Sequence, residues 1–215
     1  AVAMSVLPLF IDPAIAVALL TLPILLTNAQ QVITGEGWRK IVPQFYVAGG
    51  LTFATTFLVS QFLPKIPSPV VSGVIGVTLV LFAVSAMVNI RLPVSKSLGW
   101  QIAVGLSSGL IGGLSAVKTP IMIYCTALNL SREEFIVSAG FLFFSGGVGL
   151  LLGLSLADVF NPSLLSVSIG AVIMAFAGFQ IGALIRRRIN ATLFRKLLLW
   201  TMLILGLQMV LLSLV

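Results

Sequence analysis

The chain has 215 residues, of which 59% are hydrophobic and only 8% are charged. Soluble domains carry about 25% charged residues, so this composition excludes a water-soluble globular protein and indicates a chain surrounded by lipid. Twelve basic and five acidic residues give a formal net charge of +7. The chain has no histidine and a single cysteine, which excludes an internal disulfide and removes the commonest metal ligand and proton shuttle. We therefore expect no metal and no cofactor.

Seven uncharged stretches are long enough to cross a bilayer, since a hydrocarbon core of about 30 Å needs about 20 apolar residues in a helix. They contain 19 to 27 residues each and cover 13–35, 41–64, 66–90, 97–117, 135–157, 159–185 and 197–215. Two further apolar stretches, 1–11 and 119–131, are too short to span. The sequence therefore predicts an all-α integral membrane protein with several crossings.

The distribution of the basic residues predicts the orientation of these spans. Lysine and arginine concentrate in cytoplasmic loops, which assigns the connections at 39–40, 91–96 and 186–196 to the cytoplasmic side. The connections at 63–69 and 155–162, with only Lys65 and Asp158 as charges, then lie outside.

This orientation leaves one crossing unaccounted for. Stretches 97–117 and 135–157 both start inside, so the chain over 97–131 must enter the membrane and return to the same side. We interpret it as a re-entrant hairpin, with its break in the run 109–120, where three glycines and one proline favour an interruption. A helix of about 12 residues, about half a membrane in length, then leads to Ser131.

The two halves of the chain repeat this order with opposite orientation. A short apolar piece containing Pro8 precedes three spans, as the piece containing Pro120 precedes the last three. We expect two inverted-topology repeats, about 1–90 and about 97–215, joined by the linker 91–96, each a re-entrant or broken helical hairpin plus three transmembrane helices. We expect the first hairpin to be incomplete in this chain. Inverted repeats with broken helices are typical of secondary transporters.

Two blocks of sequence resemble the motifs of the sulfite exporter TauE/SafE family. The first is 22–31 (LPILLTNAQQ) with Trp38-Arg39-Lys40, and the second comprises 109–115 (GLIGGLS), 119–124 (TPIMIY) and 128–135 (LNLSREEF). The resemblance implies a permease for sulfite, organosulfonates or related small oxyanions and carboxylates, in the cytoplasmic (inner) membrane of a prokaryote. The chain departs from the family at 116–118, which reads Ala-Val-Lys where glycine and proline are typical, and this bears on the substrate.

Lys118 is the one charge deep in an otherwise apolar region, and a charge within the membrane is a candidate functional residue. Thr119 would begin the descending helix, whose free N–H groups and dipole favour an anion. Ser115 and Thr119 supply hydroxyl donors, and Gly113 allows close approach of the backbone. The alternative is that Lys118 extends to the head-group region or caps carbonyl groups.

A second set of candidates lies on the other predicted spans. Thr27, Asn28 and Gln31 lie on the first span, with Asn28 and Gln31 three residues apart and so on one face. Ser145 is the expected inverted counterpart of Thr27, and Ser5 in the first short piece completes the set of substrate-binding candidates. Polar groups at such depth either line a pathway or bond neighbouring helices, and for Gln31 both interpretations stay open.

All five acidic residues fall at the predicted ends of spans, so no buried carboxylate is available for proton coupling or for catalysis. We therefore expect a secondary transporter rather than an enzyme, working by alternating access on a small anionic substrate. The expected partners are that substrate and the lipid bilayer, without nucleic acid, and a homodimer is left open. An anion channel and a noncatalytic membrane assembly subunit are the alternatives.

Overall fold

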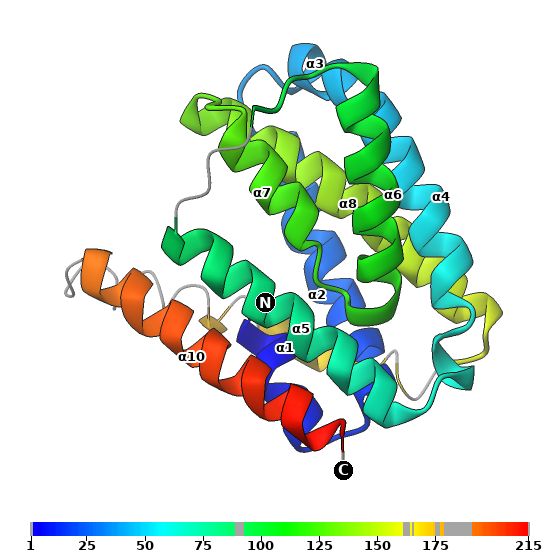
Figure 1. Ribbon diagram of the computed structural model, residues 1–215. Coiled ribbons are helices and arrows are strands. Elements are labelled where there is room, and N and C mark those ends of the chain that lie inside the picture. The colour runs from blue at the N-terminus through cyan, green and yellow to red at the C-terminus, as the bar shows by residue number, and fades with distance from the viewer. Residues whose placement is uncertain are drawn as a thin grey trace.

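The computed structural model describes residues 2–88, 93–160, 164, 166–174, 177–178 and 191–214, and every regular element among them is a helix (Figure 1). The predicted all-α class is therefore confirmed. The α-helices are α1 (Val2–Val6), α2 (Pro13–Thr34), α3 (Trp38–Ile41), α4 (Tyr46–Ser60), α5 (Ser68–Val88), α6 (Leu98–Ser115), α7 (Thr119–Ala127), α8 (Arg132–Leu156) and α10 (Ala191–Leu212). Short 3-10 helices occupy Leu7–Leu9, Val42–Phe45 and Leu63–Lys65.

Four helical segments in the described part of the chain are long and apolar enough to cross a membrane: Pro13–Thr34, Trp38–Lys65, Ser68–Val88 and Arg132–Leu156. They coincide with four of the predicted spans, and Lys196–Leu212 adds a shorter apolar helix where another was expected. Residues 161–163, 165, 175–176 and 179–185 of the predicted span 159–185, the basic segment 186–190 and residues 91–92 of the linker lie outside the described residues.

Polar side chains determine where two of the long helices begin. The carboxylate of Asp12 accepts hydrogen bonds from the N–H groups of Ala14 (2.9 Å) and Ile15 (3.3 Å), with Pro13 in the first turn of α2. Ser131 and Glu134 form a capping box at the start of α8, with reciprocal bonds of 3.2 and 3.0 Å. Both N-termini therefore follow from local chemistry.

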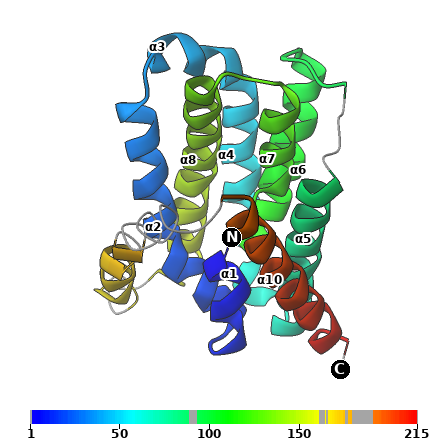
Figure 2. The ribbon, with the colours of Figure 1, turned by 90° about the vertical axis from the view of Figure 1, so that its left-hand side faces the viewer.

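The bundle has two ends (Figures 1 and 2). The Arg39 end holds α3, the linker residues 93–97 and the turn between α7 and α8. The Asp12 end holds the turn before α2, the turn after α4 and the end of α8. Two of the connections predicted to be cytoplasmic, 39–40 and the described part of 91–96, thus lie at the same end of the bundle.

Glycines allow α6 and α8 to pack closely against α4, parallel to it. On α6, Gly105 contacts Ala48, and Gly109 contacts Thr52 and Thr55, so both helices advance in the same direction. A Cβ atom at Gly109 would lie 2.5 Å from Cβ of Thr55. On α8, Gly146, Gly149 and Gly153 contact successive turns of α4 over 52–60 in the same way. α4 is therefore the helix around which this part of the bundle is assembled.

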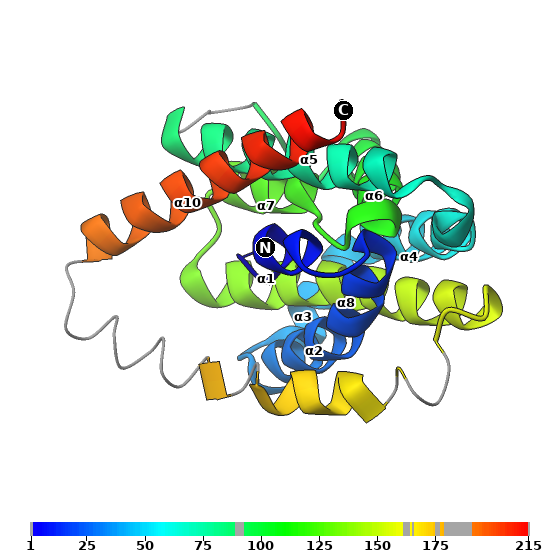
Figure 3. The same cartoon turned by 90° about the horizontal axis from the view of Figure 1, so that it is seen from below.

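Two further pairs of helices pack antiparallel. α2 crosses α8 so that its last turn, at Gly35, contacts Val137 near the start of α8, while Leu25 contacts Gly147. α5 and α10 run side by side in Figure 3, and Gly76 of α5 packs against Gly206 of α10. The relative directions of these helices agree with the directions traced from the basic loops.

α6 and α7 form a helical hairpin with both outer ends at the Arg39 end. α6 has 18 residues and a length of about 27 Å, whereas α7 has 9 residues and a length of about 14 Å. The helix continues through the glycines and ends only at Ser115, because these glycines pack against α4 and leave the α6 backbone intact. The break is Ala116 to Lys118, where Ala116 has a left-handed φ of 56°. α7 is shorter than the 12 residues predicted.

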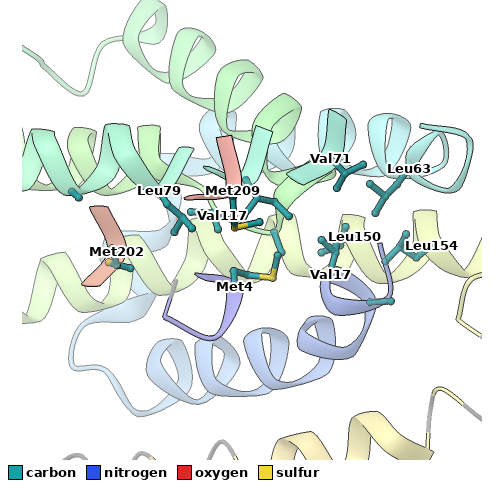
Figure 4. Packing of buried hydrophobic residues seen from close by; sticks show 14 residues of the cluster. Met4, Val17, Leu63, Val71, Leu79, Val117, Leu150, Leu154, Met202 and Met209 are labelled. Atoms are coloured by element: carbon teal, nitrogen blue, oxygen red, sulfur yellow. The ribbon is translucent and has the colours of Figure 1, made fainter. Parts of the chain in front are cut away.

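Buried apolar side chains form two clusters, one toward each end of the bundle. The cluster at the Asp12 end includes Leu63, Leu154 and Met202, and Figure 4 shows Val117 of the break among them. The cluster at the Arg39 end includes Phe45, Ile121 and Val137. Val117 and Ile121 belong to different clusters, so the segment that joins them passes from one apolar layer to the other.

Candidate functional site

Lys118 lies in that joining segment and is fully enclosed by protein, with an exposed fraction of 0%. It is the N-cap residue of α7, and its own side chain makes no capping hydrogen bond. Within the described residues its Nζ atom has no hydrogen-bond partner. The alternative that Lys118 extends to a head-group region or caps carbonyl groups does not agree with this burial and lack of bonding.

Two glycines provide the space that the lysine side chain occupies. A Cβ atom at Gly112 of α6 would lie 2.7 Å from Cγ of Lys118 and 2.9 Å from its Cε. A Cβ atom at Gly146 of α8 would overlap Cε of Lys118 and lie 3.0 Å from Cγ2 of Thr52 on α4. The lysine is thus held between α6 and α8 beside α4, and any larger residue at either glycine position would displace it.

The charge of Lys118 has no acidic neighbour. The chain has five acidic residues, and all are at helix ends: Asp12 before α2, Glu36 before α3, Glu133 and Glu134 in the first turn of α8, and Asp158 after it. Instead of a carboxylate, the aromatic ring of Phe143 lies near the amine, with Nζ 5.8 Å from the ring centroid. A cation–π contact of this kind compensates only part of the cost of burying an ammonium group.

The start of α7 adds to the positive potential at this point. The first N–H groups of a helix lack partners within it, and its dipole places partial positive charge at its N-terminus. Lys118 and Thr119 stand at this terminus. Because the amine, the helix terminus and low exposure coincide, the arrangement favours an anion that can be stripped of water.

The hydroxyl groups predicted beside Lys118 are engaged with the backbone. Ser115 Oγ lies 2.8 Å from the carbonyl oxygen of Ile111 and accepts from the N–H of Val117 at 3.2 Å. Thr119 donates to the carbonyl of Thr78 on α5 at 3.3 Å. Both residues therefore stabilise the break between α6 and α7. Gly113 contacts Val59 of α4, and its neighbour Gly112 is the glycine that borders the lysine.

The second predicted set lies along α2 and α8. Thr27 and Asn28 donate to carbonyl groups one turn earlier in α2, at Pro23 and Ile24, each at 2.7 Å. Gln31 is exposed near the Arg39 end and borders Gly140.

Ser145 donates to the carbonyl of Phe141 at 2.9 Å and lies close to Gly49 of α4. Ser5 is in α1, but its side chain lies outside the described residues. The hydrogen bonds and glycine contacts described here for Thr27, Asn28, Gln31 and Ser145 lie within or between α2, α4 and α8 and do not involve Lys118.

Four residues near the lysine were not among those predicted from sequence. Gly112 and Gly146 border the lysine side chain, Thr52 lies beside Gly146, and the buried Ser108 lies one turn before Gly112 on α6. Thr52 and Ser108 carry no charge and stand in ordinary hydrophobic spans, so the sequence offers no signal for them. The glycines do offer one, because each belongs to a Gly-Gly pair in a span.

The model of one protein family, described as Sulfite exporter TauE/SafE, matches residues 1–209. The chain belongs to this family. Neither a curated protein nor a solved structure matches it. The TauE/SafE resemblance drawn from the motif blocks is confirmed, and the match covers both halves of the chain. Members of the TauE/SafE family are membrane transporters rather than enzymes, so this is a multi-pass membrane protein of the transport class.

Proposed function

We propose that this TauE/SafE protein is a secondary transporter that moves sulfite, an organosulfonate or a related small oxyanion across the cytoplasmic membrane of a prokaryote, with Lys118 as the central anion ligand. The observation that carries the proposal is the fully buried amine of Lys118 without a partner at the break between α6 and α7. A buried cation is costly unless it is paired. A transported anion would supply the missing partner for part of each cycle.

Alternating access accounts for the position of Lys118 between the two apolar clusters. The clusters close the layer of Lys118 from both ends of the bundle, since Val117 belongs to one and Ile121 to the other. An anion reaches the lysine only after one cluster opens, and it leaves on the other side only after the other opens. This corresponds to an occluded state in the transport cycle.

Inverted repeats provide a physical route to such alternation. In the predicted repeats α2 corresponds to α8 and α5 corresponds to α10, and each of these pairs packs antiparallel through glycine contacts. A twofold axis in the membrane plane relates helices in this manner. In this proposal the α6–α7 hairpin, with both outer ends at the Arg39 end, is the re-entrant element that enters from the cytoplasm. These relations support the repeats about 1–90 and about 97–215.

The test is transport by purified protein in liposomes. Wild-type protein should move sulfite or a short alkanesulfonate, and Lys118→Met should reduce the rate by at least about 100-fold, because the charge that replaces the anion's hydration is gone. Lys65→Met is the matched control, since Lys65 is exposed at the Asp12 end, and it should keep the wild-type rate. Sulfite or sulfonate transport by Lys118→Met at the rate of the control would overturn the assignment of Lys118.

A further inference from the structure

Four buried hydroxyl groups lack a hydrogen-bond partner among the described residues: those of Thr52 in α4, Ser108 in α6, Ser138 in α8 and Ser168. All four side chains have an exposed fraction of 0%. Buried hydroxyl groups nearly always find a partner, and an unsatisfied one costs about 1 to 3 kcal/mol. Such groups call for an explanation when they occur near one another.

Other buried hydroxyl groups of the bundle follow the usual behaviour. Thr21 donates to the carbonyl of Val17 at 2.9 Å, and Thr78 donates to that of Val74 at 2.7 Å. A threonine in a helix can satisfy its hydroxyl within its own helix in this manner. Thr52 and Ser108 occupy helices that offer the same carbonyl groups, so their lack of partners is specific to their positions.

Thr52 lies at the same point of the bundle as the lysine. Its Cγ2 atom and the Cε atom of Lys118 both contact the position that a Cβ atom of Gly146 would take. Thr52 also lies on the face of α4 that contacts Gly109 of α6. The side chain of Thr52, which carries this hydroxyl, is therefore beside the lysine chain rather than in a remote part of the core.

Ser108 approaches the same layer from α6. It precedes Gly112 by four residues, so the two share one face of the helix, and Gly112 borders the stem of Lys118. Its neighbour Gly109 packs against the backbone of Thr52. Ser138 is eight residues before Gly146 on α8, about two turns nearer the Arg39 end. Among these hydroxyl groups, that of Thr52 belongs to a side chain beside the lysine, and that of Ser108 lies one helical turn from the glycine that borders the lysine.

We infer that the hydroxyl groups of Thr52 and Ser108 are the second and third ligands of the anion held by Lys118, and that they select oxyanions with three terminal oxygens over planar carboxylates. The inference rests on the proposed function and specifies its substrate class. Each hydroxyl donates one hydrogen bond to one oxygen while Lys118 binds another. A sulfite or sulfonate group has three oxygens for three donors, whereas a carboxylate has two.

The test measures binding of sulfite, methanesulfonate and acetate to purified protein by calorimetric or thermal-shift titration. Thr52→Val keeps the shape of the side chain and removes the hydroxyl, and Ser108→Ala removes the other. Each should weaken sulfite and methanesulfonate binding about 10- to 100-fold, as expected for a hydrogen bond to a charged group. Acetate should bind wild type more weakly or not at all, and its affinity should change by less than about threefold.

Matched variants separate the loss of a donor from general damage. Thr52→Ser keeps a hydroxyl at the same position and should retain binding of both three-oxygen anions. Thr21→Val removes a hydroxyl that is already satisfied within α2 and should bind as wild type does.

Wild-type sulfite affinity in both Thr52→Val and Ser108→Ala, or an equal loss of acetate affinity, would overturn this inference while Lys118→Met still abolishes binding. Undiminished binding by Lys118→Met, or no binding of any of the three anions by wild type, would instead overturn the proposed function.

Discussion

Replacing Lys118 by methionine should stabilise the protein while it abolishes transport. Methionine has a similar length and volume, so it fills the space between Gly112 and Gly146 without creating a cavity. The substitution removes a fully buried amine that has no hydrogen-bond partner among the described residues. A lysine at the centre of a spanning helix costs about 2.5 to 3.5 kcal/mol on insertion scales.

The magnitude follows from that cost. For a protein of this size 1 kcal/mol corresponds to about 2 to 4 °C in Tm, so the full cost would raise Tm by about 5 to 14 °C. Tm is measured in detergent by loss of the monodisperse peak after heating, with Lys65→Met as the control, which should change Tm by less than about 2 °C. A saturating anion should raise the Tm of wild type and leave that of Lys118→Met unchanged.

The opposite result would refute the reasoning. If Lys118→Met lowers Tm by several degrees, the amine makes a stabilising interaction in the folded protein, and Lys118 is a structural residue rather than a ligand. A rise in Tm with unimpaired transport would separate the burial cost from function and leave no role for the amine in anion binding.

Three further substitutions test the packing around the site. Gly146→Ala would place a Cβ atom against Cε of Lys118 and Cγ2 of Thr52, so we expect it to lower Tm by about 3 to 10 °C. Gly50→Ala on α4 is the control, because no atom lies within 4 Å of the new Cβ, and it should raise Tm slightly. Equal effects of the two substitutions would contradict the register of α4 and α8. Gln101→Leu would remove the amide that donates to the carbonyls of Lys96 and Gln44 at 2.9 and 3.1 Å. The loss should lower the free energy of unfolding by about 1 to 3 kcal/mol and increase proteolysis of residues 93–97. Unchanged proteolysis would exclude Gln101 as the anchor of this linker. Asp12→Ala would remove the N-cap of α2 and the partner of Ser68 and should cost about 0.5 to 2 kcal/mol in thermal unfolding, whereas Asp12→Asn should retain most of the cap.

Much of the fold could be predicted because a lipid environment requires long uncharged stretches, which are easily recognised in a sequence. Uncharged runs of about 20 residues require helices, since the backbone must satisfy its own hydrogen bonds in hydrocarbon. The start of α8 was equally predictable, because Ser131 and Glu134 form a local capping box that needs no tertiary partner. The position of the α6–α7 break within the run 109–120 was less so. The glycines there suggested an interruption, but packing against α4 keeps α6 helical as far as Ser115.

The candidate site was only partly predictable, for a related reason. A charged residue within an apolar stretch can be recognised from the sequence alone, and this predicts Lys118 as a candidate. The hydroxyl of Thr52 becomes unusual only because the parallel packing of α4, α6 and α8 brings it beside that lysine and away from any partner. Ser115 and Thr119 are close to Lys118 along the chain, which favours them as ligands, yet both hydroxyl groups bond the backbone.

The glycine spacing is the link between the packing and the site. Gly105, Gly109 and Gly113 repeat every four residues and place one face of α6 directly on α4, while Gly112, one position away, faces the lysine. On α8, Gly149 and Gly153 contact α4, and Gly146 contacts both α4 and the lysine. The residues that allow the helices to approach thus also determine the space around the amine. A shift of α6 or α8 along α4 would change the surroundings of Lys118 directly, and this couples helix movement to anion binding.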